Sequence, residues 1–197
     1  MRKIPTEYEN PIDDILIDLA DKACPYFKKN DCIPNEISII SLFLGLFSAY
    51  QLFIDNNILA GIFWILSYWF DCLDGHYARK YNMETVLGDY IDHVSDLIKI
   101  CAIIYVFIYK YNFIAWKLYL VLIVMTVLSL SHLGCQEIYY DEITHIDAPL
   151  IGVYKCLCPY DDAKKALKIT KYVGCGTVNI IVMCMCMFYN NKLYNNL

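Results

Sequence analysis

Five aspartates in one stretch are the residues of this sequence best suited to chemistry. The stretch reads DCLDGHYARKYNMETVLGDYIDHVSD, lies between two strongly apolar segments, and carries Asp71, Asp74, Asp89, Asp92 and Asp96. A carboxylate in or beside a membrane span costs on the order of 3 kcal/mol, so these residues indicate a function. The spacings of three (71 to 74) and four (92 to 96) place each pair on one face of a helix. Two such helices facing each other would gather four carboxylates, which are ligands that Mg²⁺ or Mn²⁺ prefers.

The composition indicates a membrane protein. The chain has 197 residues, of which 58% are hydrophobic and 19% charged, and its mean hydropathy is +0.40. A soluble domain is typically about 45–50% apolar and about 25% charged. The net charge of −5 and the lack of a dense basic run exclude nucleic acid as a partner.

The ten cysteines do not resemble a disulfide framework. The two C-x-C pairs lack the spacing of zinc ligands. Four cysteines lie in apolar stretches, where the residue behaves as a small hydrophobe: Cys101, Cys175, Cys184 and Cys186. We therefore expect the cysteines to serve packing in a reducing or membrane setting.

The N-terminal region predicts an amphipathic helix. Asn10 is a suitable N-cap and Pro11 a suitable first residue. An apolar stripe follows at residues 12, 15, 16, 19 and 23, and aspartates occupy much of the opposite face. Such a helix either lies on a membrane surface or covers a core, and the pattern alone fits both.

The remaining chain predicts an all-α, polytopic membrane helix bundle of about six transmembrane helices. The predicted helical segments are residues 37–54, 58–70 with a continuation through Gly75, 84–109, 113–133 and 172–189. Residues 136–147 are polar, and 146–160 suggest a half-span or a distorted helix. We expect two units: residues 1–33, a cytosolic segment with the amphipathic helix, and residues 34–197, the transmembrane domain.

The distribution of basic residues predicts the orientation. Five lysines and arginines precede the first span, whereas the turn at residues 55–57 has none. The N-terminus and the Arg79–Lys80 turn are therefore expected on the cytosolic side.

The central stretch resembles the signature of the CDP-alcohol phosphotransferase family (class I CDP-alcohol phosphatidyltransferases). It reads D-x-x-D-G-x-x-A-R from Asp71 to Arg79, then, after eight residues, G-x-x-x-D-x-x-x-D from Gly88 to Asp96. All eight fixed positions are present. Pro34-Asn35-x-x-Ser38 also resembles the family's P-N-x-x-T motif at the start of the first span. The resemblance covers residues 10 to about 133.

Each residue type in this signature has a physical reason. Two divalent ions about 4 Å apart would neutralise a transferring phosphoryl group and its leaving group. Asp71, Asp74 and Asp92 are the expected ligands, with Asp96 at the edge of the second ion. Gly75, Ala78 and Gly88 keep the helix surfaces shallow so that a nucleotide can approach. Arg79 offers a planar fork to phosphate that lysine lacks.

The resemblance also implies roles. A carboxylate matching Asp96 is the family's general base: it takes the proton of an acceptor alcohol, whose oxygen attacks the β-phosphate of a CDP-alcohol, and CMP leaves. Residues near the nucleotide match Asn35, Ser38, Gly75, Arg79 and Thr85. The family fold is a six-helix membrane bundle, usually a homodimer, open to the cytosol, and in a eukaryote the membrane would be of the endoplasmic reticulum type.

Several polar residues have simpler interpretations. Asp89 lies off the face of Gly88, Asp92 and Asp96 and is expected at the solvated surface. His76 and His93 are expected to be hydrogen-bonded neighbours of the site rather than ligands. Residues 132–142, HLGCQEIYYDE, form either a contact with the substrate head group or a loop.

The substrate pair stays open between two branches. Asp92-His93 resembles the enzymes that transfer from CDP-choline or CDP-ethanolamine to diacylglycerol. The other branch transfers from CDP-diacylglycerol to a polar alcohol, and we find no convincing basic set for an inositol-type acceptor after Arg79-Lys80. Two rival functions are a divalent-metal transporter and an inactive scaffold. A transporter does not explain the glycines, alanine and arginine at fixed spacing.

Overall fold

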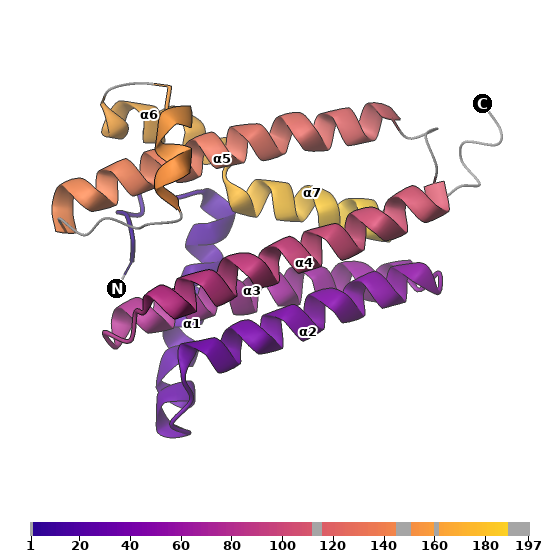
Figure 1. Cartoon of the computed structure of the whole chain (residues 1–197), viewed down its shortest axis with the longest axis horizontal. Coiled ribbons are helices and arrows are strands. Elements are labelled where there is room, and N and C mark those ends of the chain that lie inside the picture. Colours follow the sequence, from indigo (N-terminus) through magenta and orange to yellow (C-terminus); the bar gives the residue numbers. More distant parts are fainter. Residues whose placement is uncertain (1, 112–115, 145–150, 160–161, 189–197) are drawn as a thin grey trace.

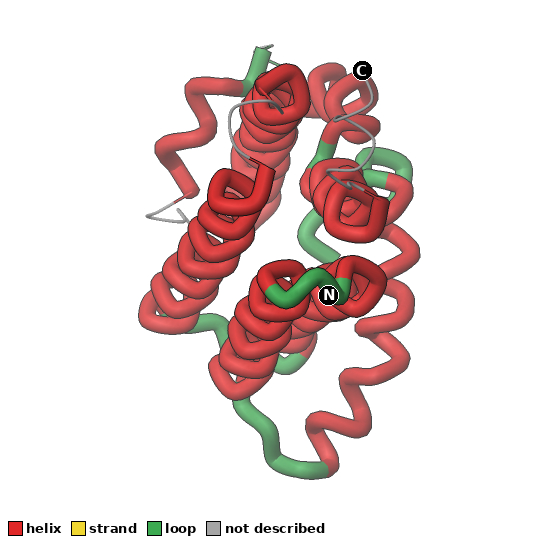
Figure 2. The backbone as a smooth tube through the Cα atoms, turned by 90° about the vertical axis from the view of Figure 1, so that its right-hand side faces the viewer, coloured by secondary structure: helices red, strands yellow, loops and turns green. Residues whose placement is uncertain are grey.

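The structure, a computed structural model, describes residues 2–111, 116–144, 151–159 and 162–188. The secondary structure of these residues is helical throughout, without a strand (Figure 2). The elements, in chain order, are α1 (Pro11–Lys29), α2 (Pro34–Phe53), α3 (Asn57–Lys80), α4 (Val86–Tyr111), α5 (Trp116–Thr144), the 3₁₀ helix η2 (Ile151–Leu157), α6 (Ala163–Thr170), the 3₁₀ turn η3 (Lys171–Val173) and α7 (Cys175–Phe188). The predicted all-α class is confirmed.

Helices α2, α3, α4, α5 and α7 run roughly along the longest axis, and α1 crosses them (Figure 1). Among the described residues, four segments are long and apolar enough to cross a membrane: Pro34–Phe53, Asn57–Lys80, Tyr119–Glu142 and Ala163–Phe188. Helix α4 has 26 residues but carries the charged residues of the second half of the signature, and it is not among these four. The fold is therefore the predicted helical membrane bundle.

Helix α1 begins as its sequence predicts. The Asn10 side chain accepts hydrogen bonds from the backbone N–H groups of Ile12 (2.9 Å) and Asp13 (3.4 Å), and Pro11 is the first helical residue. The N-cap satisfies backbone donors that a helix start leaves without partners.

Small residues turn α1 toward the bundle. Ala20 and Cys24 are fully buried against α3, whereas Ile15 and Leu19 of the apolar stripe remain 62% and 48% exposed. The helix thus covers a core with one face and still presents apolar side chains outward. Helix α1 therefore covers a core, which is one of the two predicted roles. Its exposed apolar side chains also suit the other role, a helix in the plane of a membrane surface, because α1 crosses the bundle axis.

Serines hold α2 and α3 close together. Ser41 Oγ donates to the Ser67 carbonyl (2.9 Å), Ser67 Oγ donates to the Ser41 carbonyl (2.7 Å), and Ser48 Oγ donates to the Ala60 carbonyl (2.7 Å). Small side chains with interhelical hydrogen bonds let membrane helices approach closely.

An apolar cluster from α2, α3, α4 and α7 fills the end of the bundle away from α1. Its buried residues are Ala49, Leu52, Ala60, Trp64, Ile103, Val106, Phe107, Val182, Met185 and Cys186. Packing there fixes the crossing of α3 and α4, and with it the relative position of the aspartates at the other end.

The C-terminal third differs from the sequence-based expectation. Helix α5 continues to Thr144 through the stretch predicted to be a polar region after the span. Its polar side chains are accommodated because they are buried in contacts: Glu137 pairs with Lys3, and Gln136 donates to Glu9 (3.1 Å). Residues 151–157 of the suspected half-span form the short 3₁₀ helix η2, while residues 145–150 and 160 lie outside the described residues.

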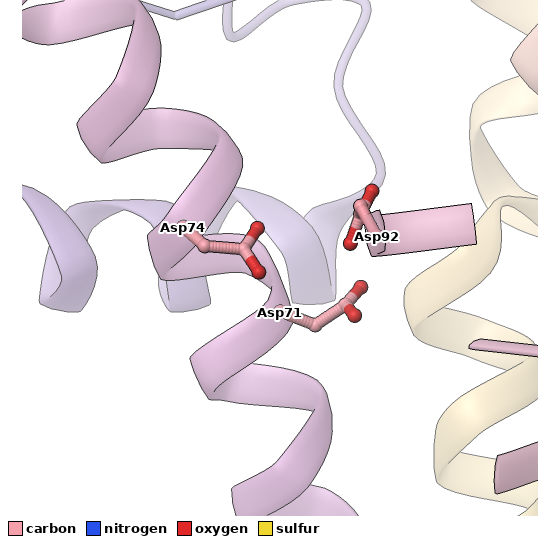
Figure 3. A group of neighbouring side chains, drawn as sticks. All are labelled: Asp71, Asp74 and Asp92. Atoms are coloured by element: carbon pink, nitrogen blue, oxygen red, sulfur yellow. The ribbon is translucent and has the colours of Figure 1, made fainter. Parts of the chain in front are cut away.

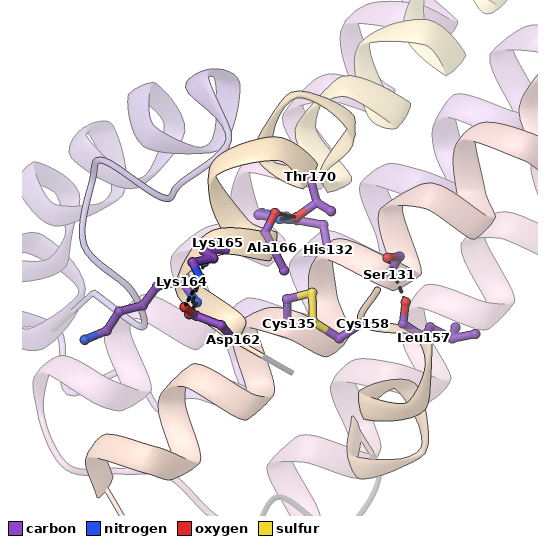
Figure 4. The surroundings of a disulfide bond; sticks show 10 residues. All are labelled: Ser131, His132, Cys135, Leu157, Cys158, Asp162, Lys164, Lys165, Ala166 and Thr170. Atoms are coloured by element: carbon purple, nitrogen blue, oxygen red, sulfur yellow. Dashed lines mark hydrogen bonds and ion pairs between the residues drawn. A yellow bond between two sulfur atoms is a disulfide. The ribbon is translucent and has the colours of Figure 1, made fainter. Parts of the chain in front are cut away.

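A disulfide joins Cys135 of α5 to Cys158, just after η2 (Figure 4). The expectation that the cysteines serve packing is therefore wrong for this pair, and the other eight are free. The two partners are 23 residues apart, and only the fold of the chain back onto α5 brings them together. Ser131 Oγ also donates to the Leu157 carbonyl (2.9 Å) and holds η2 against α5.

Candidate active site

Three of the signature aspartates meet between α3 and α4. Asp71 and Asp74 lie on the same face of α3, and Asp92 reaches them from α4 (Figure 3). One carboxylate oxygen from each lies within 4.8 Å of the other two. Asp74 is only 4% exposed, and its Oδ2 has no hydrogen-bond partner among the described residues. Buried carboxylates without a compensating cation are costly, so the group fits a divalent ion.

Asp96 lies beside this group and is joined to it by Lys99. The Lys99 ammonium is 2.7 Å from Asp96 Oδ1 and 2.8 Å from Asp71 Oδ1, and it donates to Ser41 Oγ (2.8 Å). Lys99 is 5% exposed. The sequence-based site missed this residue. The available signal was a lysine inside an apolar helix, three residues after Asp96, where an ionisable residue usually has a function.

The side chain of Lys99 occupies space that a glycine leaves free. A Cβ placed on Gly45 of α2 would lie 2.6 Å from Lys99 Cγ and 2.7 Å from its Cδ. Such contacts are far inside the van der Waals limit, so only glycine allows Lys99 to cross toward Asp71. Gly45 is thus a part of the site that the signature does not include.

The predicted nucleotide-binding residues gather at one end of the aspartate group. A Cβ on Gly88 would lie 3.0 Å from Thr85 Oγ1 and 3.1 Å from Asn35 Oδ1, so Asn35 of α2 is a neighbour of Thr85 and Gly88 at the start of α4. Thr85 Oγ1 accepts a hydrogen bond from the Gly88 N–H (3.0 Å) where α4 begins. The guanidinium of Arg79 lies over Gly75, with Nη1 3.3 Å from the position of a Cβ there. The buried Nε of Arg79 has no hydrogen-bond partner among the described residues.

A single cavity of about 650 Å³ connects these groups. All the residues predicted for the site line it: Asn35, Ser38, Asp71, Asp74, Gly75, Ala78, Arg79, Thr85, Gly88, Asp92 and Asp96. Lys99 lines it as well. The cavity is large enough for a nucleotide and part of a second substrate.

The comparisons with known proteins decide the family. A model described as CDP-alcohol phosphatidyltransferase matches residues 31–191. The chain belongs to this family. Together with the four apolar segments, membership identifies an integral membrane protein.

Two curated relatives share part of the sequence. The archaetidylinositol phosphate synthase of Pyrococcus horikoshii is 31% identical over 72 residues, which are 36% of this chain and 38% of that protein. An uncharacterized protein of Aquifex aeolicus is 32% identical over 79 residues, 40% of each chain. The matches thus span about two fifths of the length of these relatives. No solved structure matches the chain.

Further polar residues of this CDP-alcohol phosphatidyltransferase-family chain line the same cavity. They come from the N-terminal segment, α1 and α5: Glu9, Asp13, His132, Gln136 and Glu137. Sequence reasoning did not assign the first two. For residues 132–142 it left a head-group contact or a loop open, and the structure shows a helix whose polar side chains face the cavity.

Burial perturbs the two acids of this set that lie outside the spanning segments. The pKa of Glu9 is raised to about 7, chiefly by burial and further by the neighbouring Asp13. Burial also raises the pKa of Asp13 to about 6, although hydrogen bonds from Tyr68 and the Gly176 N–H oppose the rise. Both residues therefore hold their charge at a cost, which the nearby Arg2 and Arg79 partly offset for Glu9.

The remaining polar residues near the signature are His76, His93 and Asp89. His76 is a hydrogen-bonded neighbour, as predicted: its Nε2 lies 2.8 Å from Asp21 Oδ1 on α1. His93 Nδ1 lies 2.8 Å from the Asp89 carbonyl. Asp89 itself is half-buried and lines the cavity, so it is less solvated than predicted, and it is not part of the group of Asp71, Asp74 and Asp92.

Proposed function

We propose that the chain is a metal-dependent phosphotransferase of phospholipid synthesis. It transfers the substituted phosphate of a CDP-alcohol to an acceptor alcohol and releases CMP. The observation that supports this most is the group of Asp71, Asp74 and Asp92 within 4.8 Å, in the same cavity as Arg79 and the open glycine surfaces. Family membership supports the same reaction class.

The donor set fits two divalent ions, Mg²⁺ or Mn²⁺. Asp71, Asp74, Asp92 and Asp96 would hold them, and the unpartnered Asp74 Oδ2 is an oxygen that such an ion would satisfy. Bound there, the ions would neutralise the pyrophosphate charge and stabilise the leaving group.

The residues of the chain bind and orient the two substrates. Arg79 donates hydrogen bonds to a phosphate, as its fork geometry allows. Asn35, Ser38 and Thr85 offer polar contacts to the nucleotide, while Gly75, Ala78 and Gly88 let it approach the helices. Lys99 keeps the carboxylates of Asp71 and Asp96 in place by contacting both.

Asp96 acts as the general base. It removes the proton of the acceptor hydroxyl, whose oxygen forms a bond to the β-phosphorus of the CDP-alcohol. The bond from that phosphorus to the oxygen bridging to the α-phosphate breaks, and CMP leaves with both electrons of the bond. Holding both reactants in line in one enclosed site supplies much of the rate enhancement.

Two substrate pairs are compatible with this site. One is CDP-choline or CDP-ethanolamine with diacylglycerol, and the other is CDP-diacylglycerol with a polar alcohol. The name of the Pyrococcus relative, archaetidylinositol phosphate synthase, supports an inositol phosphate head group for that protein. The chain would form a homodimer, with residues 1–33 and the site facing the cytosol, in an endoplasmic reticulum-type membrane if the source is eukaryotic.

Release of CMP from membranes containing the protein tests the proposal. Each CDP-alcohol is offered with its acceptor in the presence of Mg²⁺ or Mn²⁺. Asp96→Asn should reduce release by at least about a hundredfold, the usual range for loss of a general base. Asp31→Asn is the matched control, because Asp31 is exposed and its left-handed backbone (φ 53°) suits asparagine.

Full turnover in the Asp96→Asn protein would refute the assignment of the base. An absence of CMP with every substrate pair would favour the scaffold, and metal uptake into liposomes without CMP would favour the transporter.

A further inference from the structure

The outer side of α6 carries a dense group of lysines. We call it the basic face and define it by Lys164, Lys165 and Lys168 together with Ile169 and Tyr172, which are all exposed. Spacings of three and four residues place the three lysines and Ile169 on one side of α6, and Tyr172 follows in η3. The basic face thus combines three positive charges with two large side chains.

The inner side of α6 is buried in the protein. Ala163, Ala166 and Leu167 pack in an apolar cluster with the N-terminal segment and α5. Thr170 Oγ1 lies 2.9 Å from His132 Nδ1 of α5 (Figure 4). These contacts fix the rotation of α6 about its own axis, so the lysines stay on the outside.

Acidic groups compensate little of this charge. Residues 162–173 carry four lysines and one aspartate, a net charge of +3 in a chain whose net charge is −5. Asp162 caps α6 and lies 3.6 Å from Lys165, an exposed pair of the kind that contributes little. Lys164 lies 5.9 Å from the centre of the Tyr139 ring, and Lys168 has no ion-pair partner among the described residues. The lysines therefore keep most of their charge available for a ligand.

Helix α6 lies where the chain enters the membrane. It opens the segment Ala163–Phe188, which is long and apolar enough to cross, and this segment has no charged residue after Lys171. The Asn10 side chain at the start of α1 donates to the Lys171 carbonyl (2.6 Å) and to Thr177 Oγ1 (2.8 Å). The start of α7 is thereby level with the start of α1, which crosses the bundle axis and suits a membrane surface (Figure 1). Both observations place the basic face at the boundary between the apolar membrane interior and water.

The chemistry of the basic face suits anionic phospholipid. Lysines just outside a membrane span attract anionic head groups, and each adds about fivefold in affinity near the surface. Ile169 and Tyr172 are 61% and 62% exposed beside them, and an apolar and an amphipathic side chain both favour the membrane interface. A soluble acidic partner would use the charges, but it would leave these two side chains in water.

We infer that the basic face docks on the anionic phospholipid head groups of the membrane in which the chain lies. Docking holds α6 and, with it, the apolar cluster that α6 shares with α5 and the N-terminal segment. Polar residues of these two elements line the cavity: Lys3, Glu9, Gln136 and Glu137. The lipid surface therefore stabilises one wall of the site. This inference concerns binding and does not depend on the reaction proposed above.

Thermal unfolding of the full chain in mixed micelles of a non-ionic detergent and phospholipid tests the inference. Phosphatidylserine or phosphatidylglycerol should raise the melting temperature in a saturable way, because a ligand that binds only the folded state stabilises it. Phosphatidylcholine, which has no net charge, should leave it unchanged. Raising the NaCl concentration from about 0.1 M to about 1 M should remove most of the rise, because the Debye length falls from about 10 Å to about 3 Å.

Charge variants assign the effect to α6. The triple change Lys164→Gln, Lys165→Gln and Lys168→Gln should raise the mole fraction of phosphatidylserine that gives half of the rise by at least about tenfold. Changing the same three lysines to arginine keeps the charge and should keep the original value. The matched control makes an equal change of charge at exposed lysines of α1 and should alter the value little: Lys22→Gln, Lys28→Gln and Lys29→Gln.

Several outcomes would overturn the inference. These are an equal rise with phosphatidylcholine, no rise with either anionic lipid, no loss in the α6 glutamine variant, or an equal loss in the α1 variant. The same rise with inorganic phosphate in place of lipid would show that the basic face binds free anions rather than a membrane. The proposed function is tested separately by CMP release, which none of these outcomes decides.

Discussion

At the scale of single residues, Lys99 is the most consequential residue outside the signature. It contacts carboxylates on two helices and a serine on a third, and it does so while almost fully buried. A single ammonium that satisfies Asp71 and Asp96 in this setting fixes the spacing of the site before any ion binds. Removing one partner of a buried ion pair typically costs about 3–5 kcal/mol.

We predict that Lys99→Met lowers CMP release by at least about a hundredfold, since it leaves Asp71 and Asp96 misplaced and uncompensated. The same variant should unfold at a lower temperature. Lys22→Met, an exposed change on α1, is the matched control and should alter neither property. Normal release by Lys99→Met would show that the lysine only stabilises the bundle.

Gly45→Ala gives an independent measure of the same contact. The added methyl group would displace the Lys99 stem, so activity should fall while every charge remains. Gly61→Ala is its control, because a Cβ there meets the flexible Met187 side chain and the backbone of α7, away from the cavity. Equal losses of activity in Gly45→Ala and Gly61→Ala would argue against a specific role of Lys99.

At the scale of elements, the N-terminal segment and α1 belong to the site. They bring Glu9 and Asp13 to the cavity and cross the bundle (Figure 1). The same element joins α3 at its other end, where Asp21 contacts both His76 (2.8 Å) and Lys80 (2.7 Å). These contacts lower the pKa of Asp21 to about 2.

The raised pKa of Glu9 predicts how pH affects stability. Between its ordinary value of 4.5 and the folded value of about 7, the folded protein keeps a proton that the unfolded chain releases. The contribution of Glu9 to the free energy of unfolding therefore falls as pH rises through this range. Glu9→Gln should flatten the decline in melting temperature between pH 4.5 and pH 7, as measured by thermal unfolding of the protein without substrates.

The control variant Glu7→Gln should show the same decline in melting temperature between pH 4.5 and pH 7 as the original protein. A melting temperature of Glu9→Gln that falls as steeply as that of the original protein would show that Glu9 does not hold the extra proton.

Helix boundaries show what local patterns can predict. The start of α1 follows from Asn10 and Pro11, because an N-cap depends only on the next three residues. The end of α5 does not follow from a local pattern, since the polar residues after Leu133 predict the end of a span there. Gln136 and Glu137 remain helical because Glu9 and Lys3, more than a hundred residues earlier, provide partners for them.

At the scale of the whole molecule, the two turns that flank α3 lie at opposite ends of this helix. The turn before α3 contains Asp55 and Asn56, and the turn after it contains Tyr81 and Asn82. Because α3 is long and apolar enough to cross a membrane, these turns should face opposite sides. The basic residues around α1 predict that the second turn faces the cytosol.

Labelling of single cysteines in sealed vesicles checks this orientation. In a background without accessible cysteines, a cysteine introduced at Asn82 should react with an impermeant reagent from the cytosolic side, and one introduced at Asn56 only from the other. Labelling of both positions from the same side would contradict the crossing of α3.

The sequence by itself determined the membrane class, the helical fold and the spacing that brings Asp71, Asp74 and Asp92 together. These features depend on composition and on neighbours three or four positions apart, which a helix fixes locally. Only the tertiary structure decided that Lys99 enters the site over Gly45, that Cys135 pairs with Cys158, and that Gln136 of α5 donates to Glu9 of the N-terminal segment in the cavity. Such contacts join distant segments, and their geometry depends on how whole helices pack, which no local pattern encodes.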